Sequence, residues 1–196
     1  MRFGRVEVSG SFFLLFSWLY YQDSQKIVPL TFLACFLHEC GHCLALKALH
    51  IEIRLIHLSC IGAQIYLKSP LTQLQECFVA FCGPAVNLLL AVYSYFIINN
   101  DILFGINLSL AIFNLLPIGQ LDGSRILHNL IAWRSSGTFA DQILTGVGTA
   151  LLIVIWLLGC ALIYLFRNFT LFLVASWLIL RTNLFKKQQI LLKELK

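Results

Sequence analysis

The residues best suited to chemistry form a His-Glu-x-x-His pattern at positions 38–42. On an α-helix, His38 and His42 are one turn apart, so both imidazoles point the same way. Two such nitrogens can bind one Zn²⁺, while Glu39 beside them acts as general base on a water that the ion activates. The competing interpretation is a pair of structural histidines that hydrogen-bond to neighbouring helices, with Glu39 protonated.

The pattern lies inside an apolar segment that runs from residue 27 to 49, and the whole chain is similarly apolar. Hydrophobic residues make up 59% of the chain and charged residues 12%, with a mean hydropathy of +0.84. Soluble domains have about 25% charged residues, so this composition indicates a polytopic membrane protein. An ionisable cluster at membrane depth then indicates a functional site. The net charge of +5 does not indicate a nucleic-acid partner, because the basic residues are scattered at the ends of apolar segments.

Six apolar segments are candidates for membrane-spanning helices. They cover approximately residues 8–21, 27–49, 76–98, 102–118, 143–166 and 169–185. Residues 51–68 instead alternate apolar and polar side chains on both sides of Gly62, which predicts two short strands. We therefore expect an all-α polytopic membrane protein of about six transmembrane helices, with a short membrane-associated β-hairpin between the second and third. Residues 1–185 would form one intramembrane domain, followed by a short basic amphipathic tail at 186–196.

The distribution of positive charge predicts how these segments are oriented. With the N-terminus in the cytoplasm, every Lys and Arg except Lys26 and Arg167 falls on the cytoplasmic side or at a cytoplasmic helix end. This bias predicts that both termini are cytoplasmic. The second and fourth segments then both run inward, so the histidines and Asp122 reach the same cytoplasmic side of the membrane.

A catalytic zinc site needs a third protein ligand and one open position for water. Asp122 follows the Pro and Gly residues that end the fourth apolar segment, and it is the best-placed candidate. A structural alternative makes Asp122 the N-cap of a helix that begins near Ser124. Glu76 is the second candidate ligand, although a solvated carboxylate is ordinary at the start of a span. The remaining histidines fit polar surface positions better than ligand positions: His50, His57 and His128.

The chemistry that follows from such a site is amide hydrolysis. Glu39 would take the proton of the attacking water and later pass it to the leaving amine, while the metal polarises the carbonyl. A substrate that reaches a site inside the bilayer must itself be a membrane-embedded segment, and its helix must unwind before the carbonyl is accessible. A strand edge in residues 51–68 is a candidate clamp for the extended segment. The alternative is that these residues form only a structural re-entrant loop.

Three ordered motifs resemble the site-2 protease family of intramembrane zinc metalloproteases (peptidase family M50). They are HECGH at 38–42, GPAVN at 83–87 and NLLPIGQLDG at 114–123. The resemblance implies that one zinc ion is held by His38, His42 and Asp122, and that Glu39 is the catalytic base. Further residues are expected to bind substrate or support the active site: Asn87, Asn114, Gly83, Pro84, Pro117 and Gly62.

The layout looks most like the sporulation branch of this family, whose members cleave a membrane-associated pro-sigma factor. The chain departs from that branch because no nucleotide-sensing CBS domain follows residue 185, and no PDZ domain interrupts the apolar segments. We therefore expect a multi-pass protein of a bacterial cell membrane with its site towards the cytoplasm; the sequence names neither substrate nor regulator. The alternative is a catalytically inactive scaffold or helix-binding chaperone of the same fold, which would have no use for Glu39. A transporter with structural zinc would need four closed ligands or repeated halves, and we find neither in the sequence.

Overall fold

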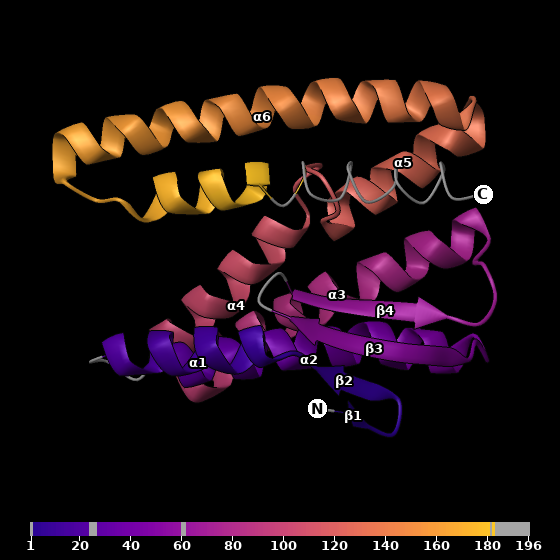
Figure 1. The fold of residues 1–196 in the computed structure, drawn as a ribbon, viewed down its shortest axis with the longest axis horizontal. Helices are drawn as coiled ribbons and strands as arrows, with labels where there is room; N and C mark the ends of the chain where they lie inside the picture. Colours follow the sequence, from indigo (N-terminus) through magenta and orange to yellow (C-terminus); the bar gives the residue numbers. More distant parts are fainter. Residues whose placement is uncertain (1, 24–26, 60–61, 181, 183–196) are drawn as a thin grey trace. The chain divides into compact units, whose positions relative to one another are not determined.

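The computed structural model describes residues 2–23, 27–59, 62–180 and 182. Contacts divide the chain into two compact units, Met1–Leu115 and Leu116–Lys196. Figure 1 shows the elements of both units in chain order, from indigo to yellow. We call them the N-terminal and the C-terminal unit.

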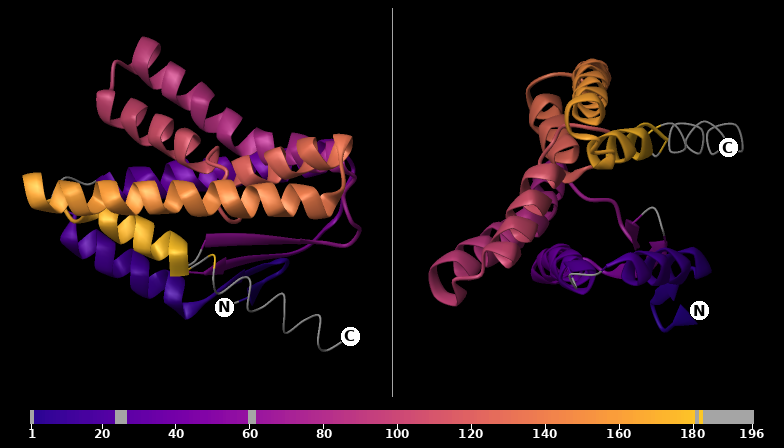
Figure 2. Two further views of the ribbon diagram at one scale, coloured as in Figure 1. Left: turned by 90° about the horizontal axis from the view of Figure 1, so that it is seen from above. Right: turned by 90° about the vertical axis from the view of Figure 1, so that its left-hand side faces the viewer.

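Four α-helices and one turn of π-helix build most of the N-terminal unit. They are α1 (Gly10–Gln22), α2 (Ile27–Ala48), α3 (Gln73–Tyr93), the π-helix η1 (Ser94–Ile98) and α4 (Asp101–Asn114). Helix α3 packs against both α2 and α4. Figure 2 shows α3 and α4 as a pair of neighbouring helices joined by a short turn. The helix that contains the His-Glu-x-x-His pattern is therefore one of three helices in mutual contact.

Helix α2 has defined signals at both of its ends. The backbone N–H of Val28 donates a hydrogen bond to the Asp23 carboxylate at 2.7 Å, which satisfies one of the donors left over in the first turn. At the other end, His50 has a φ of 57° and the N–H of Ile51 donates to the carbonyl of Leu46. This left-handed residue with its back-bonded neighbour terminates the helix as a Schellman-type cap does.

The close contact between α2 and α3 depends on a glycine. A Cβ atom on Gly41 would lie 2.7 Å from the carbonyl oxygen of Cys82 and 2.9 Å from a methyl group of Val86. Small residues of this kind let the backbones of membrane helices approach closely. Gly41 lies directly before His42, so the close approach occurs at the histidine pattern itself.

The strands form one four-stranded sheet in the order β1-β2-β3-β4. Strands β3 (Ile53–Ser59) and β4 (Gly62–Leu67) are antiparallel neighbours within the segment predicted as a hairpin. The sequence did not predict β1 (Arg2–Phe3) or β2 (Val6–Val8), and β2 pairs in parallel with β3. The sheet therefore has two strands more than expected, and β4 is one of its two edge strands, β1 being the other.

One face of the sheet packs on the end of α2. Three side chains form the centre of this core and three strand residues pack against them: Ala45, Leu46 and Val79, with Ile53, Ile65 and Leu67. Leu46 is only 1% exposed and lies one helical turn after His42. The sheet is thereby fixed beside the half of α2 that bears the histidines.

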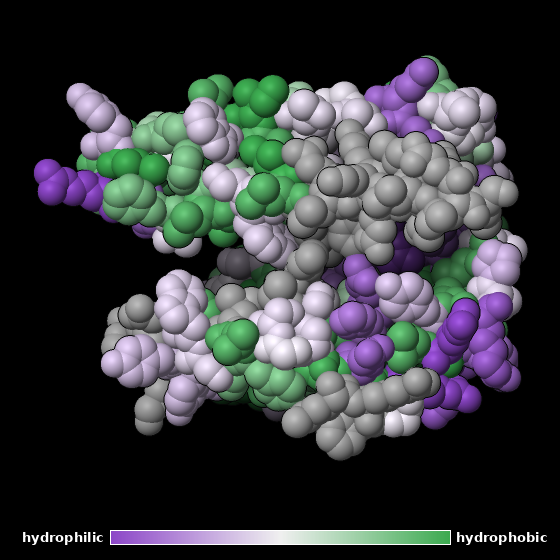
Figure 3. Space-filling view, viewed as in Figure 1, coloured by the Kyte–Doolittle hydropathy of each residue, from purple (hydrophilic) through white to green (hydrophobic). Residues whose placement is uncertain are grey.

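The C-terminal unit begins with a loop and contains α5 (Asp122–Arg134), α6 (Gly137–Phe166) and a shorter helix, Thr170–Leu180. In the most apolar window of α6, only 6% of the residues are buried. Figure 3 shows hydrophobic side chains, in green, over much of α6. Such a surface suits contact with lipid rather than with water.

Three helices in the described part of the chain are long and apolar enough to cross a membrane: Ile27–Ala48, Gln73–Ile98 and Gly137–Phe166. Helix α1 has 13 residues and α4 has 14. At 1.5 Å per residue, a helix of 14 residues is about 21 Å long, shorter than the roughly 30 Å of a bilayer core. The six-span count therefore stays a prediction. The tail predicted at 186–196 lies outside the described residues.

Candidate metal centre

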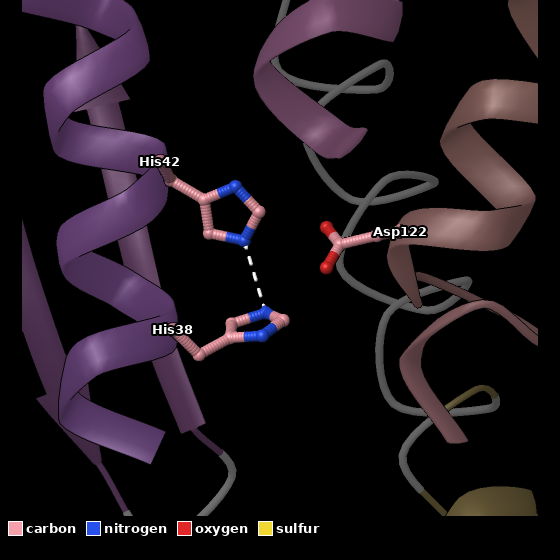
Figure 4. A group of neighbouring side chains, drawn as sticks. All are labelled: His38, His42 and Asp122. Carbon is pink, nitrogen blue, oxygen red and sulfur yellow. Dashed lines mark hydrogen bonds between the residues drawn. The ribbon is translucent and has the colours of Figure 1, made fainter. Parts of the chain in front are cut away.

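Helix α2 presents the two histidines of the pattern on one buried face. His38 is 6% exposed and His42 is 5% exposed. Their Nε2 atoms lie 3.1 Å apart, and Figure 4 shows the two rings projecting from the same side of the helix. The helical spacing predicted from the sequence is therefore present.

The other ring nitrogen of each histidine contacts an oxygen atom. The Nδ1 of His42 lies 2.8 Å from the backbone carbonyl of Val79, and the Nδ1 of His38 lies 2.6 Å from Oδ1 of Asn87. Both of these oxygens can only accept, so each Nδ1 donates a proton and each neutral ring has a lone pair on Nε2. Asn87 is fully buried and belongs to the GPAVN motif, which explains why a polar side chain stands inside α3.

When both Nε2 atoms are unprotonated, their lone pairs repel at 3.1 Å, and a cation between them would remove the repulsion. Two ligands about 2.0–2.1 Å from a tetrahedral zinc ion would lie about 3.3 Å apart. Neutral imidazole held by a hydrogen bond on its second nitrogen is also the usual form of a metal-binding histidine. The two rings of α2 therefore fit a zinc ion in donor type, protonation and spacing.

Gly83 keeps the space beside these nitrogens open. A Cβ atom at residue 83 would lie 2.4 Å from Nε2 of His42 and 2.7 Å from Nε2 of His38. The next residue, Pro84, is buried within α3. The first residue of GPAVN thus lies at the histidine pair.

Asp122 is the first residue of α5, in the C-terminal unit, and it is 6% exposed. Leu121 is the N-cap of α5 and makes no side-chain capping bond, so the alternative that Asp122 caps a helix starting near Ser124 is wrong. An Oδ1 atom of Asp122 lies 3.7 Å from Nη1 of Arg125. A carboxylate in the first turn is stabilised by the helix dipole, and Figure 4 shows that it projects away from α5.

The remaining predicted site residues differ in their surroundings. Glu39 is half-buried on α2, next to His38. Asn114 is the last residue of α4, and its side-chain Nδ2 donates to the carbonyl of Leu110 at 3.0 Å. Gly62 begins β4 with a φ of 124°, and Pro117 lies in the loop before α5.

The other residues considered as metal ligands are Glu76 and the three remaining histidines. Glu76 lies in the first turn of α3, where a carboxylate stabilises the helix N-terminus. His50 is exposed at the end of α2, and His128 contacts Asp141 through Nε2 at 3.1 Å. His57 differs from the surface position expected for it, because its Nε2 is buried and has no hydrogen-bond partner among the described residues.

Sequence analysis missed Asn107 in α4, which is hydrogen-bonded to Asn87 and thereby linked to His38. It is 4% exposed, and its Oδ1 accepts a hydrogen bond from Nδ2 of Asn87 at 3.0 Å. A polar amide inside an apolar helix was the available signal. Asn107 also precedes Asn114 by two helical turns, which places both on one face of α4.

Comparisons with known proteins agree with the three motifs. Residues 100–155 match the family model of Peptidase family M50. A Synechocystis protein whose name describes a zinc metalloprotease is 36% identical over 121 residues, or 55% of this chain and 31% of that protein. The zinc metalloprotease MJ0392 of Methanocaldococcus jannaschii is 29% identical over 141 residues, or 66% of this chain and 41% of that protein. This chain therefore spans less than half the length of either curated relative.

The fold is similar to that of a solved structure, the site-2 protease from Methanocaldococcus jannaschii. The TM-score is 0.67, the sequence identity is 24%, and the match covers 93% of this chain and 92% of that one. At this identity the similarity concerns the fold alone. Part of this chain, residues 100–155, is thus similar to Peptidase family M50, and its fold is similar to that of a site-2 protease.

Proposed function

We propose that this protein is a zinc-dependent intramembrane endopeptidase. It hydrolyses a peptide bond in or near a membrane-embedded segment of a substrate protein. The observation that carries the proposal is the histidine pair of α2, whose buried Nε2 atoms lie 3.1 Å apart. Two nitrogens at this spacing can bind one metal ion, and the missing side chain of Gly83 leaves space for that ion.

His38 and His42 supply two ligands in this proposal, and Asp122 supplies the third. Two imidazole nitrogens and one carboxylate oxygen are a donor set found in catalytic zinc sites, where the fourth position stays open for water. Asp122 is buried, and the guanidinium of Arg125 lies 3.7 Å from its Oδ1, so a cation in direct contact would compensate its charge further. Bound to these residues, zinc supplies the Lewis acidity that activates water and polarises the scissile carbonyl.

Glu39 handles the proton in the proposed reaction. It accepts a proton from the attacking water as the new carbon–oxygen bond forms at the substrate carbonyl. It then donates that proton to the amide nitrogen as the carbon–nitrogen bond breaks, so the products are a carboxyl group and an amine. Glu39 follows His38 directly on α2, which supports this role because the base is carried by the same helix as two of the ligands.

The edge of β4 is the proposed clamp for the substrate. An extended segment that adds to a sheet edge exposes its backbone carbonyls, whereas a helix keeps them in its own hydrogen bonds. Strand β4 is the last strand of the sheet, and the sheet packs on the end of α2 beyond His42. The distribution of Lys and Arg supports a site that opens towards the cytoplasmic side.

Metal content and cleavage test the proposal together. Purified wild-type protein should contain about one zinc ion per chain, and His42→Ala should contain much less. Cells that express wild type should accumulate new protein termini in their membrane proteome, and cells that express Glu39→Gln should not. Glu76→Gln is the matched control, because it also neutralises a glutamate of a membrane helix but leaves the histidine pattern intact.

Each outcome has a distinct meaning. Undiminished cleavage by Glu39→Gln would exclude the proposed role of this carboxylate. A wild-type protein that binds zinc but produces the same membrane proteome as Glu39→Gln would favour the inactive scaffold. A wild-type protein without zinc would contradict the metal site itself.

A further inference from the structure

A chain of buried side-chain amides links α4 to the histidine pair, entirely within the N-terminal unit. Asn107 Nδ2 donates to the carbonyl of Leu103 at 2.9 Å, and Asn107 Oδ1 accepts from Asn87 Nδ2 at 3.0 Å. Asn87 Oδ1 then accepts from Nδ1 of His38 at 2.6 Å. The three side chains are between 0% and 6% exposed, so water does not compete for these bonds.

The carbonyl of Leu103 determines the direction of every hydrogen bond in this series of side chains. The Leu103 carbonyl can only accept, so the amide nitrogen of Asn107 must point towards it and the oxygen must point towards Asn87. Asn87 then turns its own nitrogen towards Asn107 and towards the carbonyl of Ala34, 3.3 Å away. Only its oxygen is left for His38.

We infer that Asn107 is a positioning residue that acts through Asn87 to keep the metal-facing Nε2 of His38 unprotonated. The inference rests on the proposed function, since it concerns a ligand of the proposed zinc ion. Among the described residues, the side-chain hydrogen bonds of Asn107 join it to Leu103 and Asn87 and not to the histidines. Its effect is to select one of the two orientations of the Asn87 amide, and hence one of the two tautomers of the His38 ring.

The reversed orientation of Asn87 shows why Asn107 is needed. In that orientation Asn87 would donate to Nδ1 of His38, and the ring proton would move to Nε2, where it blocks metal binding. The Asn87 oxygen would then face two acceptor oxygens, those of Ala34 and Asn107. Without Asn107, only the longer contact to Ala34 opposes the reversal.

Two substitutions at residue 107 separate the acceptor from the volume of the side chain. Asn107→Leu has a similar size but offers no acceptor to Asn87, and Asn107→Ala serves as a second variant that cannot overpack. A neutral carboxyl group in Asn107→Asp reproduces both bonds, because its hydroxyl donates to Leu103 and its carbonyl oxygen accepts from Asn87. Ser109→Ala is the control, since Ser109 is an exposed position of the same helix.

Zinc affinity is measured on the purified full chain by competition with a chelator. We expect Asn107→Leu and Asn107→Ala to bind zinc about ten-fold or more weakly than wild type, as is typical when a second-layer partner of a ligand is lost. Asn107→Asp and Ser109→Ala should bind as wild type does. Nitrogen NMR of ¹⁵N-histidine in the metal-free protein gives the tautomer of His38, with the signal assigned by its loss in His38→Gln.

The NMR measurement distinguishes positioning from general destabilisation. Wild type should show His38 protonated at Nδ1 and bare at Nε2, and Asn107→Leu should show a partial shift of the proton to Nε2. Zinc affinity and tautomer that both stay unchanged in Asn107→Leu and Asn107→Ala would overturn the inference. If wild type binds no zinc, the proposed function fails, and an unchanged His38 tautomer in the variants would separately overturn the role of Asn107.

Discussion

Gly83 lies so close to His42 that a Cβ atom at residue 83 would come within 2.4 Å of Nε2. The same atom would lie 2.7 Å from Nε2 of His38, so it would occupy the space that both nitrogens face. The absence of a side chain at this position is therefore a requirement of the histidine pair and not only of helix packing.

Gly83→Ala should reduce zinc affinity by about 100-fold or more. Loss of a second-layer partner alone costs about 10–100-fold, and the added methyl group competes with the ion itself. The measurement is chelator competition, with thermal unfolding to verify that the variant is folded. Gly105→Ala is the matched control, because a Cβ on Gly105 of α4 would meet nothing within 4 Å. Equal zinc affinities for the two variants would contradict this explanation of Gly83.

Asp122→Ala should weaken zinc binding and abolish cleavage if Asp122 is the third ligand. Its loss leaves two imidazoles, so we expect an affinity loss beyond the roughly 10–100-fold typical of second-layer residues. Asp101→Ala provides the comparison, since Asp101 is likewise an acidic residue in the first turn of a helix. Full activity of Asp122→Ala would remove this residue from the proposed ligand set.

Ala63→Pro should impair cleavage without loss of zinc if the β4 edge holds the substrate. The backbone groups of Ile56 and Leu58 form hydrogen bonds on the β2 side of β3, with Arg5 and Ser9. The residues between them therefore bond to β4. Ala63 lies opposite Leu58, so its backbone N–H points away from β3, towards the open edge of β4. Proline removes that donor and is tolerated on the outer side of an edge strand. We expect a higher KM for a membrane-protein substrate, whereas Ala63→Val, which keeps the donor, should behave as wild type. An unchanged KM in the proline variant would argue against the clamp.

The pH dependence of stability should reveal the ion pair between Lys68 and Glu52. A hydrogen bond from Lys68, with the charge of Lys68, holds the pKa of Glu52 below its ordinary value. The folded pKa is lowered, so this contribution is present above the unfolded pKa of about 4.3 and is lost as the pH falls through the folded value. The melting temperatures of wild type and Glu52→Gln should thus differ slightly at pH 7 and converge at acid pH. A constant difference across this range would contradict the assignment.

Local patterns were sufficient to predict the elements that carry the chemistry. The apolar segment predicted at 27–49 matches α2 (Ile27–Ala48), and the alternation in 51–68 matches β3 and β4. Helical spacing alone brought His38 and His42 together, because residues four apart share a face. These features depend on neighbours in the sequence, which is why sequence analysis could find them.

Features that depend on distant partners were not predicted. Strand β2 has three residues and pairs with β3 only after α1 and α2 have intervened, so no local alternation marks it. Asn107 and Asn114 look alike in the sequence, and each donates to a carbonyl of its own helix. Only the fold distinguishes them, because Asn107 alone offers its oxygen to Asn87.

The parallel pairing of β2 with β3 has a consequence for biosynthesis. Residues Val6–Val8 leave the ribosome before α1 and α2, whereas their partner Ile53–Ser59 leaves after both helices. In a nascent chain β2 therefore has β1 as a partner, but its other edge lacks β3 until the histidine-bearing helix has been made. Completion of the sheet thus requires that all of α2 has already been synthesised, so a chain that stops before Ile53 leaves β2 without its parallel partner.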